Sequence, residues 1–216
     1  MAAGIYIIRH GQTEMNSRKV LQGRSDLPLN AAGVSQAEET AALLRSMGVR
    51  FDRVFSSPLI RAVRTAELLA PGLPVEPDFR LIEMDYGPYE GMDLLAPAPE
   101  VLDFFRDFVH NRAPEGMEPL HAVVERAGAF LESLRGLNGN ILISTHAIAM
   151  KGILEYLTPG SGGAYWSKHI GNCAVYRTES DGSGFSVPCE IFNPANDIPG
   201  EKRDRQKEDP CAQEKS

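Results

Sequence analysis

Two short apolar runs, each followed closely by a histidine, limit most strongly what this chain can fold into. Residues 5–8 precede Arg9-His10-Gly11, and a predicted strand over residues 140–144 precedes Thr145-His146-Ala147. Apolar runs of this kind are typical of strands buried on both faces of a parallel sheet. Ligands bind beyond the carboxyl ends of such strands, so both histidines are candidate site residues. Arg-His-Gly alone is weak evidence, because short motifs match by chance.

Helical patterns separate the predicted strands. Asn30 caps a helix that runs to about Met47. Ser57-Pro58 predicts the start of another helix, with Arg61 in its first turn, where an anion would bind. This alternation predicts an α/β fold, a three-layer α/β/α sandwich around a mostly parallel sheet. The remaining expected elements are strands at 51–55, near Val75, at 173–178 and at 185–192, with a turn at 181–184, and helices at 118–134 and 147–157.

A length of 216 residues suits one large domain or two small ones, and we expect a single domain over residues 1–198. Within it, residues 88–117 form a helical excursion near the site, with apolar positions such as Phe104 and Phe108 on one helix face. This helix either covers the crevice or packs at the periphery. Residues 199–216 are almost wholly polar, which predicts a disordered tail.

Composition excludes several classes of function. The net charge of −7 argues against nucleic-acid or anionic-membrane partners, which need a basic face. No apolar run reaches membrane-spanning length, and the N-terminus lacks the pattern of a signal peptide. Three widely spaced cysteines suit neither a disulfide framework nor a zinc site. We therefore expect reduced thiols and a cytoplasmic protein.

The predicted sheet brings charged residues to one edge. Arg9, His10, Arg61, Glu83 and His146 should emerge there together, with two helix N-termini nearby. Guanidinium groups match the oxygens of a phosphoryl group, which makes a phosphate ester the natural ligand. The chain has no Walker-type loop, no carboxylate cluster for Mg²⁺ and no histidine spacing typical of metal sites, so we expect neither metal nor cofactor. A histidine nucleophile is the remaining route to cleavage.

Several motifs together resemble one known family, the histidine phosphatases of the phosphoglycerate mutase superfamily. One motif alone would be weak, but they follow the family's order over residues 4–178. The matching stretches are Arg9-His10-Gly11-Gln12-Thr13 with Asn16, Ser56-Ser57-Pro58-Leu59 with Arg61-Ala62 and Thr65-Ala66, Leu81 with Glu83, Gly87 and Glu90-Gly91, and Ser144-Thr145-His146.

The resemblance implies roles for individual residues. His10 looks like the nucleophile that becomes phosphohistidine, and Glu83 like the proton donor that later activates water. Asp85 and Glu90 are rival carboxylates, but Glu83 alone lies at the matching position. The positions that resemble phosphate or substrate ligands are Arg9, Asn16, Gln22, Gly23, Arg61, His146 and Ala147.

Three functions remain open at this level. A phosphatase that hydrolyses a small phosphate ester and releases inorganic phosphate is favoured. A cofactor-dependent phosphoglycerate mutase is second, because the chain has Gln22-Gly23 where mutases carry Thr-Gly, and no Arg-rich segment after Glu83. Arg106 and Arg112 are among the few basic residues before His146 that a second phosphate could use. A binding scaffold without catalysis would be expected to lack one of the five charged residues, and none is missing.

Overall fold

The computed structural model describes residues 3–196, and within them a six-stranded sheet forms the centre of the molecule. Its order is β3-β2-β4-β1-β5-β6, and four strands pair in parallel, while β5 is antiparallel to its neighbours β1 and β6. The expectation of a mostly parallel sheet is confirmed. The strands are β1 (Ala3–Arg9), β2 (Arg53–Ser56), β3 (Val75–Pro77), β4 (Gly139–Thr145), β5 (Val175–Ser180) and β6 (Cys189–Phe192).

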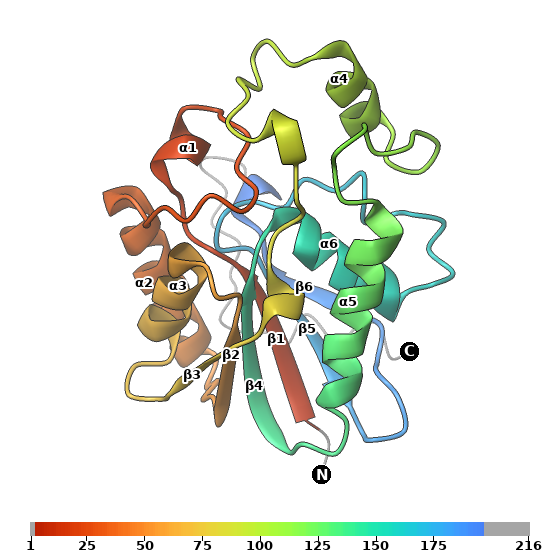
Figure 1. Cartoon of the computed structure of the whole chain (residues 1–216). Coiled ribbons are helices and arrows are strands. Elements are labelled where there is room, and N and C mark those ends of the chain that lie inside the picture. The colour runs from red at the N-terminus through yellow and green to blue at the C-terminus, as the bar shows by residue number, and fades with distance from the viewer. Residues whose placement is uncertain (1–2, 197–216) are drawn as a thin grey trace.

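Helices cover both faces of this sheet, which confirms the three-layer sandwich (Figure 1). α2 and α3 pack on one face, and α5 and α6 pack on the other (Figure 1). The helices are α1 (Glu14–Ser17), α2 (Ala31–Ser46), α3 (Ile60–Leu69), α4 (Pro99–Arg106), α5 (Leu120–Ser133) and α6 (Ala147–Leu157), with 3₁₀ turns at Phe79–Leu81, Gly87–Tyr89 and Pro194–Asn196.

Side-chain alternation along β1 explains why both of its faces are apolar. Ile5 and Ile7 belong to the core cluster under α5 and α6, whereas Tyr6 and Ile8 belong to the cluster under α2 and α3. Successive residues of a strand point to opposite faces, so a strand between two helical layers needs apolar residues at every position. This packing fixes the strand that carries Arg9 and His10.

Register then brings the ends of three strands together. Arg9 of β1 lies opposite Thr145 of β4, and the amide of His10 donates to the carbonyl oxygen of Thr145 at 2.9 Å. On the other side of β4, the amide of Ser57 donates to the carbonyl oxygen of Ser144 at 2.9 Å. The residues that follow β1, β2 and β4 therefore meet at one edge of the sheet.

Two helix starts differ in how well the sequence predicts them. Asn30 caps α2 as expected, with its Oδ1 accepting from the amide of Gly33 at 2.8 Å. The expected start of α3 at Pro58 is wrong, because this helix begins at Ile60 without a side-chain cap. The Ser57 hydroxyl accepts from the Leu59 amide at 3.3 Å but also contacts His146, so it has a second partner at the site.

The backbone conformations at Cys173 and Gly11 are fixed by close packing near the end of β1. Cys173 is not part of the expected strand: its φ of 60° is left-handed, and its amide donates to the Arg9 carbonyl at 3.0 Å, just before β5 begins. Gly11 has a negative φ, and its lack of a side chain permits close packing. A Cβ there would come within 2.3 Å of the carbonyl oxygen of Gly33, at the start of α2.

The segment between residues 88 and 117 lies above the sandwich, at the same end as α1 (Figure 1). Its apolar residues form a third core cluster with Tyr86, Ile148 and Trp166. Phe105 and Phe108 line the same cavity as Arg9 and His10, so this segment covers the crevice. The domain boundary at residue 198 stays a prediction, and the expected tail at 199–216 lies outside the described residues.

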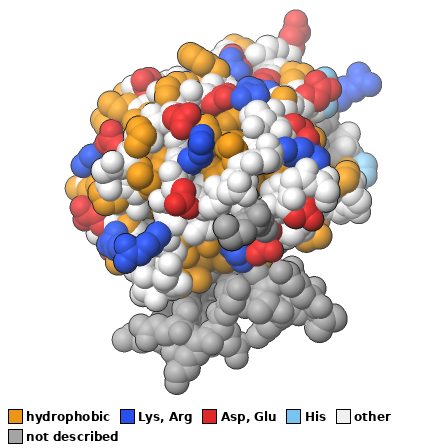
Figure 2. Space-filling view, turned by 90° about the horizontal axis from the view of Figure 1, so that it is seen from below, with side chains coloured by type: hydrophobic (Ala, Val, Ile, Leu, Met, Phe, Trp, Pro, Cys, Tyr) orange, Lys and Arg blue, Asp and Glu red, His pale blue; other side chains and the backbone are white. Residues whose placement is uncertain are grey.

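The surface of the molecule and its cysteines test three further expectations. No helix among residues 3–196 has both the length and the apolar content needed to cross a membrane. On the face seen in Figure 2, acidic and basic side chains are interspersed with apolar ones. Cys173 is a buried free thiol, as expected. Cys189 is disulfide-bonded, so the expectation of reduced thiols is wrong for this residue.

Candidate active site

A cavity of about 310 Å³ opens where the strand ends meet. Its floor is polar and its upper wall, from the excursion, is aromatic. The lining residues are Arg9, His10, Asn16, Val20, Leu21, Gln22, Glu83, Tyr86, Leu94, Phe105, Phe108, Ala147, Ile148, Lys151, Lys168, His169 and Ile170. The expected residues Arg61, His146 and Gly23 are not among the residues that line the cavity.

His10 is fixed in one tautomer at the floor of the cavity. Its side chain is 4 % exposed, and Nδ1 lies 2.7 Å from the carbonyl oxygen of Gly11. A carbonyl only accepts, so Nδ1 carries the proton and Nε2 holds the lone pair. Burial, with Arg61 and Arg9 nearby, holds the pKa of His10 well below its usual value. The ring is therefore neutral near pH 7 and can act as a nucleophile through Nε2.

Two arginines flank this imidazole. Arg9, at the end of β1, donates from Nη1 to the carbonyl oxygen of Ile170 at 2.6 Å. Arg61 is fully buried on the first turn of α3, where Nε donates to His10 Nε2 at 3.2 Å. Its Nη1 and Nη2 donate to the carbonyl oxygens of Ser25 and Gly23, both at 2.6 Å. Burial lowers the pKa of Arg61 to about 10, which leaves the guanidinium charged at neutral pH.

The second histidine packs against the first. The rings of His146 and His10 meet edge to face, with centroids 5.1 Å apart. His146 Nε2 lies 2.7 Å from the Ser57 hydroxyl. Burial, together with Arg61 and His10, holds the pKa of His146 well below its usual value. Ser57, expected only as a helix cap, thus orients a site histidine.

Glu83 lines the cavity, and its carboxylate accepts hydrogen bonds from amides at the N-terminus of α6. Its Oε1 accepts from the amides of Met84 and Ala149, at 2.9 and 3.0 Å, and its Oε2 accepts from the amide of Ile148 at 3.2 Å. A helix N-terminus favours a negative charge, and its free amides hold a carboxylate in one orientation. Oε2 therefore has one backbone contact and Oε1 has two.

The polar loop after β1 supplies amide groups. Gln22 Oε1 accepts a hydrogen bond from the Thr13 hydroxyl at 2.6 Å. Nε2, on the other side of the same amide group, therefore does not take part in this contact. Asn16 Oδ1 accepts from Asn172 Nδ2 at 3.3 Å, and Asn172 also donates to the carbonyl oxygen of His10 at 3.0 Å. Asn172 was not expected at the site, because nothing in its local sequence marks it.

Gly23 supports the loop rather than facing the cavity. Its amide donates to both oxygens of Glu90 at 2.9 Å, and its carbonyl accepts from Arg61. A Cβ here would come within 2.8 Å of the backbone carbonyl oxygen of Met84, as well as 2.5 Å from Glu90 Oε2, which favours glycine. The structure therefore does not give Gly23 a free amide for a phosphate.

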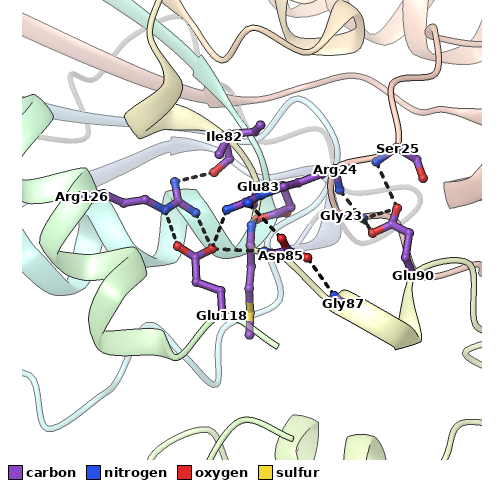
Figure 3. Close-up of polar contacts among 11 residues, drawn as sticks. Gly23, Arg24, Ser25, Ile82, Glu83, Asp85, Gly87, Glu90, Glu118 and Arg126 are labelled. Atoms are coloured by element: carbon purple, nitrogen blue, oxygen red, sulfur yellow. Dashed lines mark hydrogen bonds and ion pairs between the residues drawn. The ribbon is translucent and has the colours of Figure 1, made fainter. Parts of the chain in front are cut away.

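The rival carboxylates are used to hold loops (Figure 3). Glu90 also accepts from the amides of Arg24 and Ser25, both at 3.2 Å. Asp85 accepts from the Gly87 amide at 2.8 Å and pairs with Arg24 at 2.9 Å. Glu118 pairs with Arg24 and with Arg126, which links this network to α5. Glu83 is the one carboxylate of the described residues that lines the cavity.

Three basic residues at the far side of the cavity were missed. Lys151, Lys168 and His169 line it. Lys151 follows Ala147 by four residues, a spacing that places both on one helix face and could have revealed it. Among the described residues, no three His, Cys, Asp or Glu side chains are grouped closely enough to hold a metal ion.

Three buried nitrogens at the site have no partner among the described residues. They are Arg9 Nε, Gln22 Nε2 and His146 Nδ1. Leaving a buried donor unsatisfied costs about 1–3 kcal/mol, so such groups are uncommon in folded proteins. All three belong to residues expected to bind a phosphate.

The two buried histidines predict a pH dependence of stability. Below their ordinary pKa of about 6.5, the unfolded chain takes up a proton at each site while the folded protein does not. As the pH is lowered below about 6.5, the free energy of unfolding should therefore decrease. The decrease should reach up to about 1.4 kcal/mol per pH unit for each histidine, until the folded state is also protonated. Urea unfolding between about pH 7 and about pH 5.5 measures this slope. His10→Asn and His146→Asn should each flatten it, and an unchanged slope in both variants would contradict the assignment.

Comparisons with known proteins agree with this geometry. The family model of the histidine phosphatase superfamily (branch 1) matches residues 5–189. A probable phosphoglycerate mutase of Escherichia coli, GpmB, is 30 % identical over 202 residues, which is 90 % of this chain and 93 % of that protein.

Solved structures are similar as well. YhfR of Bacillus stearothermophilus matches with a TM-score of 0.76 and 28 % identity, over 86 % of this chain and 95 % of that one. A putative alpha-ribazole-5'-P phosphatase of Escherichia coli matches with a TM-score of 0.73 and 28 % identity, over 87 % and 95 % of the two chains. The match to the family model covers most of the chain, and the protein belongs to the histidine phosphatase superfamily.

Proposed function

We propose that this protein is a phosphomonoesterase that hydrolyses a small phosphorylated metabolite through a phosphohistidine on His10. Arg9, Arg61 and His146 bind and stabilise the phosphoryl group, with Asn16, Gln22 and Ala147 at its edge. Glu83 acts as proton donor. The products are an alcohol and inorganic phosphate, and the reaction needs no metal ion. A cytoplasmic location remains a prediction.

The first step transfers the phosphoryl group to His10. The Nε2 lone pair forms the N–P bond as the ester P–O bond breaks, and the arginines stabilise charge on the phosphoryl oxygens. Arg61 Nε donates to the same lone pair, so this hydrogen bond opens and the N–H becomes available to a phosphoryl oxygen. Glu83 gives its proton to the leaving alkoxide. We assign this proton to Oε2, which has a single backbone contact.

The second step hydrolyses the phosphohistidine. Glu83, now a carboxylate, takes a proton from water as the new O–P bond forms and the N–P bond breaks. Phosphate leaves, His10 regains its neutral form, and Glu83 is again protonated for the next cycle. The Nδ1–H to Gly11 bond keeps the imidazole in one orientation through both steps.

The observation that carries this proposal is a set of unpartnered nitrogens near a neutral histidine. Arg9, Gln22 and His146 each hold one such nitrogen. Arg9 and Gln22 line the cavity together with His10, and the His146 ring packs against the His10 ring. Phosphate oxygens are acceptors that satisfy N–H donors of this kind. The same arrangement has no evident use in a scaffold that only binds a protein partner.

A phosphoglycerate mutase is the second candidate, favoured by the name of the GpmB relative. A mutase must hold a second phosphorylated molecule. Arg106, one of the candidate ligands, is 68 % exposed on α4 and pairs with Asp103 at 3.6 Å. This arrangement favours water as the acceptor of the phosphoryl group.

The decisive experiment measures hydrolysis of p-nitrophenyl phosphate with and without EDTA, from acid to neutral pH. We expect turnover that EDTA does not reduce. Activity that depends on added Mg²⁺ would contradict the phosphohistidine mechanism, and no activity at any pH would favour a binding scaffold. Isomerisation of 3-phosphoglycerate, primed with the bisphosphate, tests the mutase directly.

A further inference from the structure

Lys151 is an unusual buried cation. It lies on α6, its side chain is 9 % exposed, and it lines the cavity that contains His10. Its Nζ donates to the carbonyl oxygen of Trp166 at 2.6 Å and lies 5.1 Å from the ring centroid of Phe108. An ammonium has three N–H donors, so two remain available.

No carboxylate of the described residues pairs with this ammonium. Glu155, one turn further along α6, is engaged elsewhere: it accepts from the Tyr165 amide and the Ser161 hydroxyl, both at 2.7 Å. Burial lowers the pKa of Lys151 to about 8, which still leaves most molecules charged at neutral pH. Glu83 and Glu155 are near enough to raise the pKa of Lys151 but do not contact the ammonium, so an anionic ligand at its open donors would lower the cost of burying this charge.

The neighbouring basic groups are less suited to hold an anion in the cavity. Lys168 Nζ lies over the ring of Tyr165, 4.8 Å from its centroid. Burial, with Arg9 and Lys151 nearby, lowers the pKa of His169, which favours its neutral form. The cavity therefore offers one buried positive charge beyond the phosphate ligands. One ammonium with two open donors matches a carboxylate, whereas a phosphate dianion is usually bound by several cations or by an arginine fork.

We propose that Lys151 determines specificity by binding a carboxylate on the part of the substrate that leaves, so that the substrate is a phosphorylated carboxylic acid. This inference rests on the proposed phosphatase function. Lys151 follows Ala147 by four residues, about 6 Å along the helix axis, so the carboxylate and the phosphorus are separated by a few bonds. Phe105 and Phe108 cover the carbon chain between them.

Matched pairs of substrates test the proposal. Phosphate esters of two-, three- and four-carbon ω-hydroxy acids are compared with n-alkyl phosphates of equal length. We expect kcat/KM for the best acid to exceed that of its alkyl partner by about tenfold or more. Lys151→Met keeps the length of the side chain and removes its charge. This variant should abolish the preference for acids, mainly by raising their KM. Its kcat/KM for the alkyl phosphates should stay within about threefold of the parent value.

Arg106→Met is the control, because this exposed arginine on α4 has a similar charge but does not line the cavity. It should keep the preference for acids. Equal kcat/KM for acids and alkyl phosphates in the parent would overturn the carboxylate subsite, and so would an unchanged preference in Lys151→Met. In either case, hydrolysis of the alkyl phosphates would still support the proposed phosphatase function. If no ester is hydrolysed, calorimetric binding of the same pairs to both proteins tests Lys151 independently of turnover.

Discussion

Replacing His10 by alanine is expected to lower phosphatase kcat by about four orders of magnitude or more, because no other group can form the N–P bond. The same change should abolish the acid-labile label that the parent protein acquires from a ³²P-labelled substrate. Quenching in alkaline detergent, which preserves an N–P bond, followed by separation of protein and phosphate measures this label, and acid treatment should release it. Retention of a stoichiometric label in His10→Ala would show that another residue is the nucleophile.

Two controls separate chemistry from folding in this experiment. His121→Ala removes an exposed imidazole from α5 and should leave both kcat and label unchanged. Circular dichroism and urea unfolding show whether His10→Ala is folded, since His10 is buried and its removal leaves a small cavity. Phosphate binding to folded His10→Ala should persist, because Arg9, Arg61 and His146 remain.

Replacing Glu83 by glutamine should affect the two steps of the reaction differently for different leaving groups. Alkyl phosphates need protonation of the alkoxide, so we expect their turnover to fall by about 10²–10⁴-fold, with no rapid phase. Nitrophenolate leaves without protonation, but the water that attacks phosphohistidine loses its base. Stopped-flow assays of p-nitrophenyl phosphate should therefore show a burst of nitrophenolate equal to the enzyme concentration, followed by slow turnover.

Asp85→Asn is the matched control for this prediction. Asp85 is a carboxylate two residues from Glu83, but it contacts Arg24 and the Gly87 amide outside the cavity. We expect this variant to show neither the burst nor the dependence on leaving group. Equal losses for alkyl and nitrophenyl esters in Glu83→Gln, without a burst, would indicate that Glu83 only holds the N-terminus of α6.

Much of the fold follows from local pattern. The buried runs at β1 and β4 and the capped start of α2 at Asn30 are visible in the sequence, because burial on two faces and amide capping impose residue types directly. The start of α3 could not be predicted in this way. Ser57 and Pro58 are good helix-starting residues, but contacts of Ser57 with Leu59 and His146 hold the backbone in another conformation.

The residues of the candidate site also fall into two groups, those that the sequence predicts and those that it does not. Arg9, His10, Glu83 and His146 follow or adjoin predicted strand ends and match a family motif, so their proximity was predictable. The spacing from Ala147 places Lys151 on the site-facing side of its helix, but the sequence does not show that Lys151 is buried, since a lysine on a helix is ordinarily a solvated one. Its burial depends on Trp166 and Phe108, which come from two segments far apart in the chain.

The amino-acid pattern was sufficient to locate the buried strands β1 and β4, and with them the positions of His10 and His146 at one edge of a parallel sheet. The family motif singled out Glu83 among three nearby carboxylates, but only the tertiary structure shows what directs it, and not the other two, to the cavity. Glu83, Asp85 and Glu90 are close in sequence, but backbone amides from separate loops and from α6 bind each one in a different place. Hydrogen bonds of this kind join distant segments and leave no local pattern. The buried charge of Lys151, and the carboxylate that it implies, arise for the same reason.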